Sequence, residues 1–358
     1  MANTPPAETE SKRARPSGKA HNARLSDRLR LTACLSSCLH FCLRSYPPPI
    51  GPIFRNVMQR MDEKNKATLI GLIAVLLWSS IVGLIRGVSE GLGATAGAAM
   101  MYTVASVILF FAVGFPKWRT FPRRYLIWGT LLFVTYELCL SLSIGYADNA
   151  RQAVEVGMVN YLWPTFTMIS AILFNKQRSN WLIFPGFVLS IIGIGWVLGG
   201  DQGFDVAEML VNVEANPLSF GLAFAGAVIW AAYCTVTARI AKGSNGVTLF
   251  FMLAALALWA KYAINGGGAM TFDVRTTVYL VLAASAIGLG YAAWNVGILH
   301  GNVTVLAGAS YFIPVLSSAL AAKLLSAPLP FAFWQGAGMV VSGSILCWIA
   351  TRRVGEQT

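Results

Sequence analysis

About ten apolar runs, each of 18 or more residues, follow one another along this chain from residue 68 onward. A run of that length can cross a lipid bilayer as a helix. Hydrophobic residues make up 56% of the sequence and charged residues 12%, whereas soluble domains average roughly 45–50% apolar and about 25% charged residues. The sequence therefore predicts an all-α membrane protein. The expected spans are 68–88, 94–115, 123–146, 150–174, 180–199, 216–241, 246–265, 275–298, 302–324 and 329–350.

Two of these spans carry the same pattern 150 residues apart. The first reads VGMVNYLWPTFTMISAILF over 156–174, and the second reads LAGASYFIPVLSSALAAKLL over 306–325. A chain that repeats itself over half its length is built from two structural copies. The register continues downstream without an insertion. The matched pairs are Tyr161 and Tyr311 (311 − 161 = 150), Pro164 and Pro314, Gly186 and Gly336, and Gly193 and Gly343.

Each copy holds five of the expected spans. An odd number of spans makes the second copy enter the membrane from the opposite side, which generates inverted repeats with a site between them. We therefore expect ten transmembrane helices, arranged as two inverted five-helix repeats around a central cavity. The predicted organisation is an N-terminal extension at 1–65, a first repeat at 66–200, an acidic connection at 201–215, a second repeat at 216–351 and a tail at 352–358.

The N-terminal extension is rich in Arg, Ser and Pro, and its one apolar run, 31–43, is too short to span a bilayer. It could be a transit peptide or a basic arm at the membrane surface. The simpler interpretation, which we favour, is a disordered tail or the product of a start codon assigned too early, since Met61 looks like a natural beginning. We expect residues 1–60 to be dispensable.

Basic residues are distributed as a membrane topology requires. The net charge is +12, and residues 1–60 hold ten Lys or Arg and three Asp or Glu, so they contribute +7. The remaining 17 basic and 12 acidic residues contribute +5. Basic residues of the apolar body gather at alternate connections, such as 116–124 and 175–180, with Lys323 as an exception. We therefore expect both termini to be cytoplasmic, the 201–215 connection to lie outside, and no nucleic-acid partner.

Polar and aromatic side chains deep in the spans are the candidates for substrate binding. Aromatic faces and a few amides suit a flat amphipathic solute, although the same residues could simply pack between helices. The candidates are Trp78, Tyr136, Asn160, Tyr161, Trp163, Trp230, Tyr233, Tyr291, Trp294, Asn295 and Tyr311.

Two prolines and two carboxylates inside spans are candidates for the transport cycle. Pro164 and Pro314 could act as hinges or shape the cavity, or they could be structural kinks. A carboxylate within the bilayer is a functional-site hypothesis by default. Glu137 has no obvious local partner and could hold a coupling proton or bond to a neighbouring hydroxyl. Glu155 could couple protons too, but a helix cap at Asp148 or Asn149 and an i,i+4 pair with Arg151 offer a structural role.

The sequence contains no arrangement typical of an enzyme. It lacks a phosphate loop, an HExxH motif and a Gly-x-Ser-x-Gly motif, and it holds three His in all. We expect no cofactor and no metal site. The expected partners are a small-molecule substrate and the lipid bilayer, and the expected state is a monomer.

The five-span halves, the prolines in spans four and nine, and the glycine-containing segments PGFVLSIIGIGWV and QGAGMVVSGSILCW resemble the drug/metabolite transporter superfamily, in its ten-helix EamA-like branch. The resemblance covers roughly residues 66–351. Within the branch, WSSIVGLIRGVSE, ARQAVEVGMVNYLWPTFT and ASYFIPVLSS most resemble the YddG-type exporters of aromatic amino acids. The resemblance implies a helical basket whose cavity is lined by spans 1, 3, 4, 6, 8 and 9, with spans 5 and 10 outside.

Two features depart from the family pattern. Many members carry a Glu just after spans four and nine, where this chain reads NKQRSN and SAPLP. Small multidrug relatives use a Glu in their first helix, and the first span here has no carboxylate. Proton-coupled drug antiport by that mechanism is therefore not expected.

The leading functional hypothesis is an exporter of aromatic or other apolar amino acids in the bacterial inner membrane, working by alternating access. An alternative is export of other metabolites or amphipathic cationic drugs through the same fold, because aromatic faces also bind cations. A membrane scaffold or sensor without a transport cycle is a hypothesis of a different class.

Overall fold

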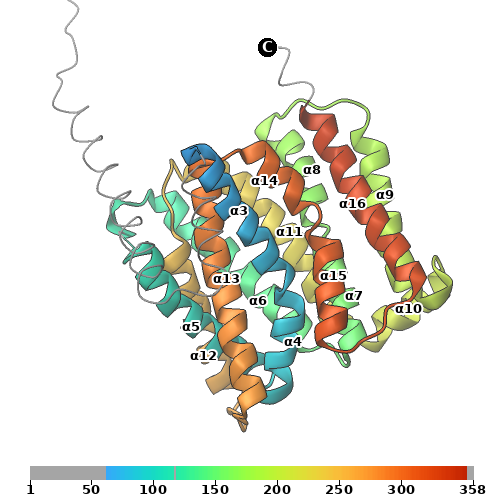
Figure 1. Cartoon of the computed structure of the whole chain (residues 1–358), viewed down its shortest axis with the longest axis horizontal. Coiled ribbons are helices and arrows are strands. Elements are labelled where there is room, and N and C mark those ends of the chain that lie inside the picture. The colour runs from blue at the N-terminus through green and yellow to red at the C-terminus, as the bar shows by residue number, and fades with distance from the viewer. Residues whose placement is uncertain (1–61, 117, 353–358) are drawn as a thin grey trace, which may run out of the picture. The chain divides into compact units, whose positions relative to one another are not determined.

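A computed structural model describes residues 62–116 and 118–352, apart from the side chains of residues 303, 304 and 352. The expectations for residues 1–61 lie outside the described residues. Described residues form helices and connections, with no strand among them, and all belong to one structural unit, 58–358 (Figure 1). The α-helices are α3 (Glu63–Ser79), α4 (Ile81–Leu92), α5 (Ala94–Val113), α6 (Thr130–Gly145), α7 (Ala150–Asn160), α8 (Trp163–Asn175), α9 (Ile183–Leu198), α10 (Val206–Ala215), α11 (Pro217–Ile240), α12 (Val247–Ile264), α13 (Val274–His300), α14 (Val303–Ser310), α15 (Ile313–Leu324) and α16 (Phe331–Arg352). Short helical turns are η1 (Trp118–Thr120), η2 (Tyr125–Gly129) and η3 (Gly200–Gln202).

Seven helical segments of the described chain are long and apolar enough to cross a membrane, and an eighth forms if α3 and α4 are taken together. The α9 and α15 helices are apolar but shorter. An all-helical fold with membrane-spanning helices is confirmed, whereas the count of ten spans stays a prediction. The seven segments are Ala94–Val113, Tyr125–Gly145, Ala150–Asn175, Pro217–Ile240, Val247–Ile264, Val274–His300 and Phe331–Thr351.

The first expected span is bent by 42° between α3 and α4, which the apolar pattern did not indicate. Ser79 donates its hydroxyl hydrogen bond to the Val75 carbonyl at 2.7 Å, and Ser80 donates to the Leu77 carbonyl at 2.7 Å. Serine hydroxyls that bond back to the preceding turn compete with the helical ladder and often accompany bends. The Ser79-Ser80 pair is the local cause that we assign to this bend.

Both repeated prolines lie in the first turn of a helix instead of a helix interior. Pro164 follows the turn at residues 161–162 and opens α8, and Pro314 follows the turn at 311–312 and opens α15. Proline suits this position because the first-turn N–H has no partner within the helix. Each of these two expected spans is therefore a pair of helical segments separated by a two-residue break.

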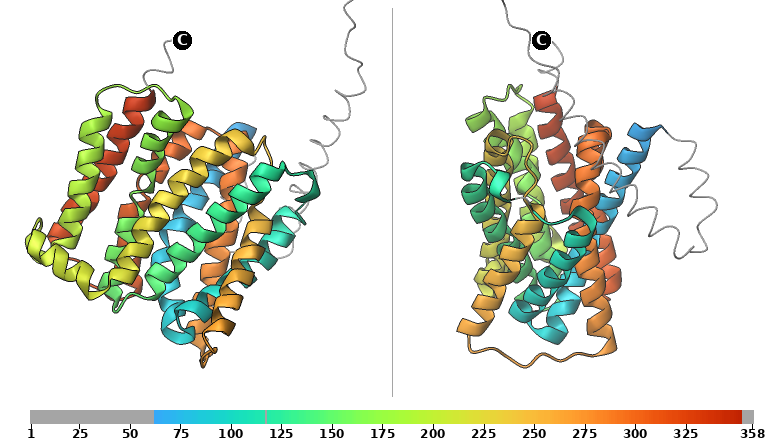
Figure 2. Two further views of the ribbon diagram at one scale, coloured as in Figure 1. Left: turned by 180° about the vertical axis from the view of Figure 1, so that it is seen from behind. Right: turned by 90° about the vertical axis from the view of Figure 1, so that its left-hand side faces the viewer.

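The α9 and α16 helices lie side by side (Figures 1 and 2). Glycines form the contact between them. A Cβ atom at Gly186 would lie 2.9 Å from the Gly343 carbonyl oxygen, and one at Gly193 would lie 2.8 Å from the Gly336 carbonyl oxygen. Larger side chains would force the backbones apart, as in other close membrane helix pairs. The two contacts are related by the 150-residue shift. Gly336 is the counterpart of Gly186, and Gly343 is the counterpart of Gly193, so each α9 glycine touches the counterpart of the other.

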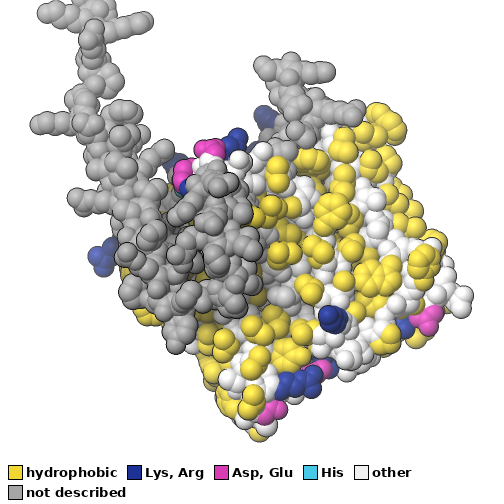
Figure 3. Space-filling model, in the orientation of Figure 1, with side chains coloured by type: hydrophobic (Ala, Val, Ile, Leu, Met, Phe, Trp, Pro, Cys, Tyr) yellow, Lys and Arg dark blue, Asp and Glu magenta, His cyan; other side chains and the backbone are white. Residues whose placement is uncertain are grey.

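Several other helices also pack closely in pairs. The α3 helix runs along α13, α11 runs along α6, and α5 packs against α12. On the face shown in Figure 3, hydrophobic side chains cover most of the helices outside the grey atoms, and charged side chains lie mainly along the edges. Trp181 is 72% exposed and Phe184 is 73% exposed. Such a wide apolar surface is unusual for a soluble monomer and suits contact with lipid.

Candidate functional site

Aromatic side chains from α6, α11 and α13 meet around Phe133. The Phe133 ring centroid lies 5.4 Å from that of Tyr233 and 5.5 Å from that of Tyr291. Trp230 stacks on Tyr233 at 4.9 Å and lies 4.4 Å from Tyr136. These separations are typical of favourable aromatic pairs. Phe133 was not among the predicted residues, because a phenylalanine in an apolar span carries no polar signal.

Two further helices contribute to this group. Trp78 on α3 meets Tyr291 at 5.1 Å and Trp294 at 5.3 Å. Trp163, in the first turn of α8, approaches Trp230 edge-on at 6.3 Å. The structure thus brings together seven predicted residues and Phe133 from five helices. We call this group the aromatic cluster: Trp78, Phe133, Tyr136, Trp163, Trp230, Tyr233, Tyr291 and Trp294.

The other predicted binding residues lie at different distances from the cluster. The Asn160 side chain is adjacent to it, because a Cβ atom at Gly226 would lie 3.1 Å from Asn160 Oδ1 and 3.9 Å from the Tyr136 ring. Tyr161 is buried at the break between α7 and α8. Asn295 is half-buried on α13, next to Trp294 in sequence. Tyr311 packs on Trp348 of α16 at 6.1 Å and is not a member of the aromatic cluster.

Among the described residues, four buried polar side-chain atoms make no hydrogen bond of good geometry: Trp78 Nε1, Asn160 Oδ1, Asn175 Oδ1 and Ser317 Oγ. The Tyr161 hydroxyl nevertheless lies close to Ser317. A buried polar group without a partner is costly, so such atoms in a folded protein call for a ligand or water. Asn160 is 3% exposed and Ser317 is fully buried. Ser317 was missed by the sequence analysis. Its only signal was a place three residues after Pro314 in the repeated segment.

Glu137 is fully buried and finds its partners on other helices. Tyr102 on α5 donates to Glu137 Oε2 at 2.6 Å, and Tyr291 on α13 donates to Oε1 at 2.7 Å. Phenolic hydroxyls that donate to a carboxyl oxygen satisfy it without a salt bridge. Because Tyr291 also belongs to the aromatic cluster, Glu137 links the cluster to α5 and α6.

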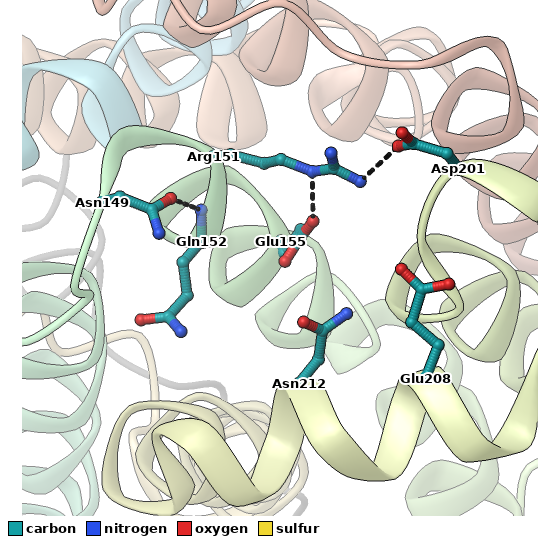
Figure 4. A pocket seen from close by; sticks show the side chains of 7 residues that line it. All are labelled: Asn149, Arg151, Gln152, Glu155, Asp201, Glu208 and Asn212. Atoms are coloured by element: carbon teal, nitrogen blue, oxygen red, sulfur yellow. Dashed lines mark hydrogen bonds and ion pairs between the residues drawn. The ribbon is translucent and has the colours of Figure 1, made fainter.

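Glu155 lies in a second polar region at the beginning of α7. Asn149 caps this helix by accepting from the Gln152 N–H at 2.9 Å. Arg151 pairs with Glu155 at 3.0 Å, as the i,i+4 spacing predicted, and with Asp201 at 2.8 Å. These groups border a pocket of about 230 Å³, completed by Glu208 and Asn212 (Figure 4). Within the described residues, no group of three His, Cys, Asp or Glu could hold a metal ion.

Comparisons with known proteins agree on one family. Residues 65–199 match the EamA-like transporter family. A relative from Escherichia coli (strain K12), named aromatic amino acid exporter YddG, is 59% identical over 290 residues, covering 81% of this chain and 99% of that protein. Its namesake from Salmonella typhimurium is 59% identical over 289 residues, with the same coverage, and one from Ancylobacter novellus is 25% identical over 298 residues.

A solved crystal structure, 26% identical to this chain, superposes with a TM-score of 0.58 and covers 81% of this chain and 99% of its own. The relatives are transporters, and the apolar helices described above make this chain an integral membrane protein. An identity of 59% over 99% of the Escherichia coli relative establishes common family membership. The chain belongs to the EamA-like transporter family of the drug/metabolite transporter superfamily, in its YddG-type branch.

Proposed function

We propose that this chain exports aromatic amino acids across the bacterial inner membrane by alternating access. The observation that carries the proposal is the aromatic cluster, in which rings from five helices adjoin buried polar atoms without partners. The names of the relatives at 59% identity point to the same substrates. Large aromatic faces with a few placed polar groups are the usual lining of a small-molecule site.

The unpartnered atoms match the two ends of an amino acid. Asn160 Oδ1 accepts hydrogen bonds and suits the ammonium group, whereas Trp78 Nε1 donates and suits the carboxylate. The Ser317 hydroxyl can serve either group. The substrate ring would then stack among Tyr136, Trp230 and their neighbours in the aromatic cluster.

The proposed architecture is two inverted five-helix repeats. It is supported by the 150-residue register of the breaks before Pro164 and Pro314 and by the reciprocal glycine contacts of α9 and α16. It is also supported by the pairing of α3 with α13 and of α11 with α6, since span 1 corresponds to span 6 and span 3 to span 8. Inverted repeats of this kind place a site at the midplane and allow either side to open.

Orientation follows from the charges. Basic residues at alternate connections favour cytoplasmic termini, and the acidic connection at 201–215 would then face the outside. The breaks before Pro164 and Pro314 would act as the hinges of alternating access, because a two-residue turn has fewer backbone hydrogen bonds to break than a continuous helix.

Glu137 would be the proton-coupling group of such a cycle. A movement of α13 that separates Tyr291 from Glu137 would expose a carboxylate with one donor fewer, and a proton could replace that donor. Glu155 is tied to Arg151 and is the weaker candidate. Flux measured over a series of pH values tests this role: the Glu137→Gln variant should lose the pH dependence of the parent, and a retained dependence would refute it.

Proteoliposomes preloaded with labelled tryptophan or phenylalanine test the proposed export. The full chain should release the label faster than empty liposomes. Trp230→Leu should slow release about twofold to tenfold, the range expected from losing one substrate–ring contact of about 0.5–1.5 kcal/mol. Trp181→Leu is the matched control, because Trp181 is 72% exposed on the outer surface. Release no faster than from empty liposomes would contradict the function, and equal losses in both variants would contradict the site.

A further inference from the structure

The pocket at the beginning of α7 lies apart from the aromatic cluster, and substrate binding at the cluster does not use it. Its volume is about 230 Å³, several times the roughly 30 Å³ that one water occupies in the liquid. Arg151, Glu155 and Gln152 come from α7, and Glu208 and Asn212 rise from α10 toward them (Figure 4). Two helices and the η3 turn therefore border a half-open space lined by charged and amide groups.

The charges of this pocket suit a ligand with both signs. One guanidinium, that of Arg151, pairs with the carboxylates of Glu155 and Asp201, and the Glu208 carboxylate lines the same pocket. A purely anionic ligand would meet three carboxylates, and a metal cation would meet the guanidinium. A molecule with one ammonium and one carboxylate has a partner for each end.

The two ion pairs of Arg151 differ in how readily a ligand can replace them. Glu155 is 6% exposed in its side chain and lies beside Arg151 on the same helix, so this pair is held in place. Asp201 is 68% exposed, and an exposed ion pair contributes little to stability. A ligand carboxylate can take the place of Asp201 on the guanidinium, which binds carboxylates in a favourable planar geometry.

The pocket also borders α7, the helix that carries Asn160 beside the aromatic cluster. Glu155 precedes Asn160 by five residues, which is about 7.5 Å along an α-helix axis. The pocket is thus one to two turns from Asn160, toward the acidic connection. In the proposed orientation the pocket lies on the outer side of Asn160.

We propose that this pocket is an outer subsite for the zwitterionic head of an amino acid, with Arg151 binding the carboxylate and Glu155 and Glu208 binding the ammonium. The Asn212 amide, which donates to the Leu198 carbonyl at 2.8 Å, has its oxygen available for the same ammonium. The proposal deepens the proposed export function, because it gives the leaving substrate a second binding step, and it rests on that function for its place in a cycle.

Glycine is the probe, because it carries the zwitterion without a ring for the aromatic cluster. Binding is measured as the thermal stabilisation of the purified full chain over a glycine titration. The parent should be stabilised by glycine and much less by glycinamide, which lacks the carboxylate, or by N-acetylglycine, which lacks the ammonium. Glu208→Gln should raise the apparent Kd for glycine at least tenfold.

Glu214→Gln is the matched control, because Glu214 is an exposed acid on the same helix and does not border the pocket. It should bind glycine as the parent does. Equal stabilisation by glycine, glycinamide and N-acetylglycine, or an unchanged Kd in Glu208→Gln, would overturn the proposal. The assay needs no transport, so it separates this outcome from a failure of export: glycine binding without tryptophan release would reject the proposed function and retain the subsite.

Discussion

The two Tyr-Pro breaks have the same backbone arrangement but different surroundings. In both, a two-residue turn precedes a helix with proline in its first turn. At the first break, Leu162 is 2% exposed, and Asn160 and Trp163 lie at the aromatic cluster. At the second, Phe312 is 52% exposed, and the counterparts of Asn160 and Trp163 are Ser310 and Ile313 (160 + 150 = 310; 163 + 150 = 313).

The polar groups at the two breaks make the difference clearest. Ser310 donates its hydroxyl to the Ala307 carbonyl at 2.8 Å and so finds a partner within its own helix. Asn160 Oδ1 is buried without one. The same backbone feature is present at both breaks, whereas the unpartnered amide oxygen lies at the first break and the Ser317 hydroxyl lies in the helix after the second. Substitutions at matched positions test how unequally the two breaks contribute to function.

The largest contrast is expected between Asn160→Ala and Ser310→Ala. A hydrogen bond to a charged group contributes about 1.5–3 kcal/mol, so Asn160→Ala should lower phenylalanine flux about tenfold to a hundredfold. Ser310→Ala removes a bond within one helix and should change flux less than about threefold. Flux in proteoliposomes, normalised to folded protein by thermal stability, measures both. Equal losses would show that the breaks are functionally equivalent.

A smaller contrast is expected between Trp163→Ile and Ile313→Leu. Trp163→Ile converts the first break to the residue of the second and removes the edge-on contact with Trp230. One aromatic pair contributes about 0.5–1.5 kcal/mol, so flux should fall about twofold to tenfold. Ile313→Leu conserves volume in a buried position and should leave flux nearly unchanged. A greater loss in Ile313→Leu would indicate that the substrate binds nearer to the second break.

The smallest difference is expected between Pro164→Ala and Pro314→Ala. Alanine is compatible with a first helical turn, and loss of proline there costs about 0.4–1 kcal/mol through the unfolded chain. Both variants should unfold at slightly lower temperature, by similar amounts, and keep flux within about threefold of the parent. A loss of more than tenfold in flux in one variant alone would show that the two breaks play different roles in the transport cycle.

The fold class and much of the candidate site could be predicted from the sequence, because the length of an apolar run and the presence of aromatic residues within it are local features. Trp78, Tyr136 and Trp230 stood out on their own helices, and the structure brings their rings together. Phe133 and Ser317 carried no such signal, since phenylalanine and serine are ordinary in apolar helices.

Contacts between distant residues could not be predicted. The partners of Glu137 come from positions 35 residues earlier and 154 residues later, so no local pattern reveals them. Tyr311 matches Tyr161 in sequence, yet it packs on Trp348 of α16. The bend at Ser80 depends on hydroxyls whose bonding back to the helix is one of several options for serine in an apolar run.

The most direct test of the central claim compares release of phenylalanine with release of cyclohexylalanine, which has a saturated ring of similar size, from the same proteoliposomes. The account predicts faster release of phenylalanine by the parent, because stacking in the aromatic cluster needs an aromatic face, and loss of that preference in Trp230→Leu. Equal release of the two amino acids by the parent would contradict the claim that the aromatic cluster binds the substrate.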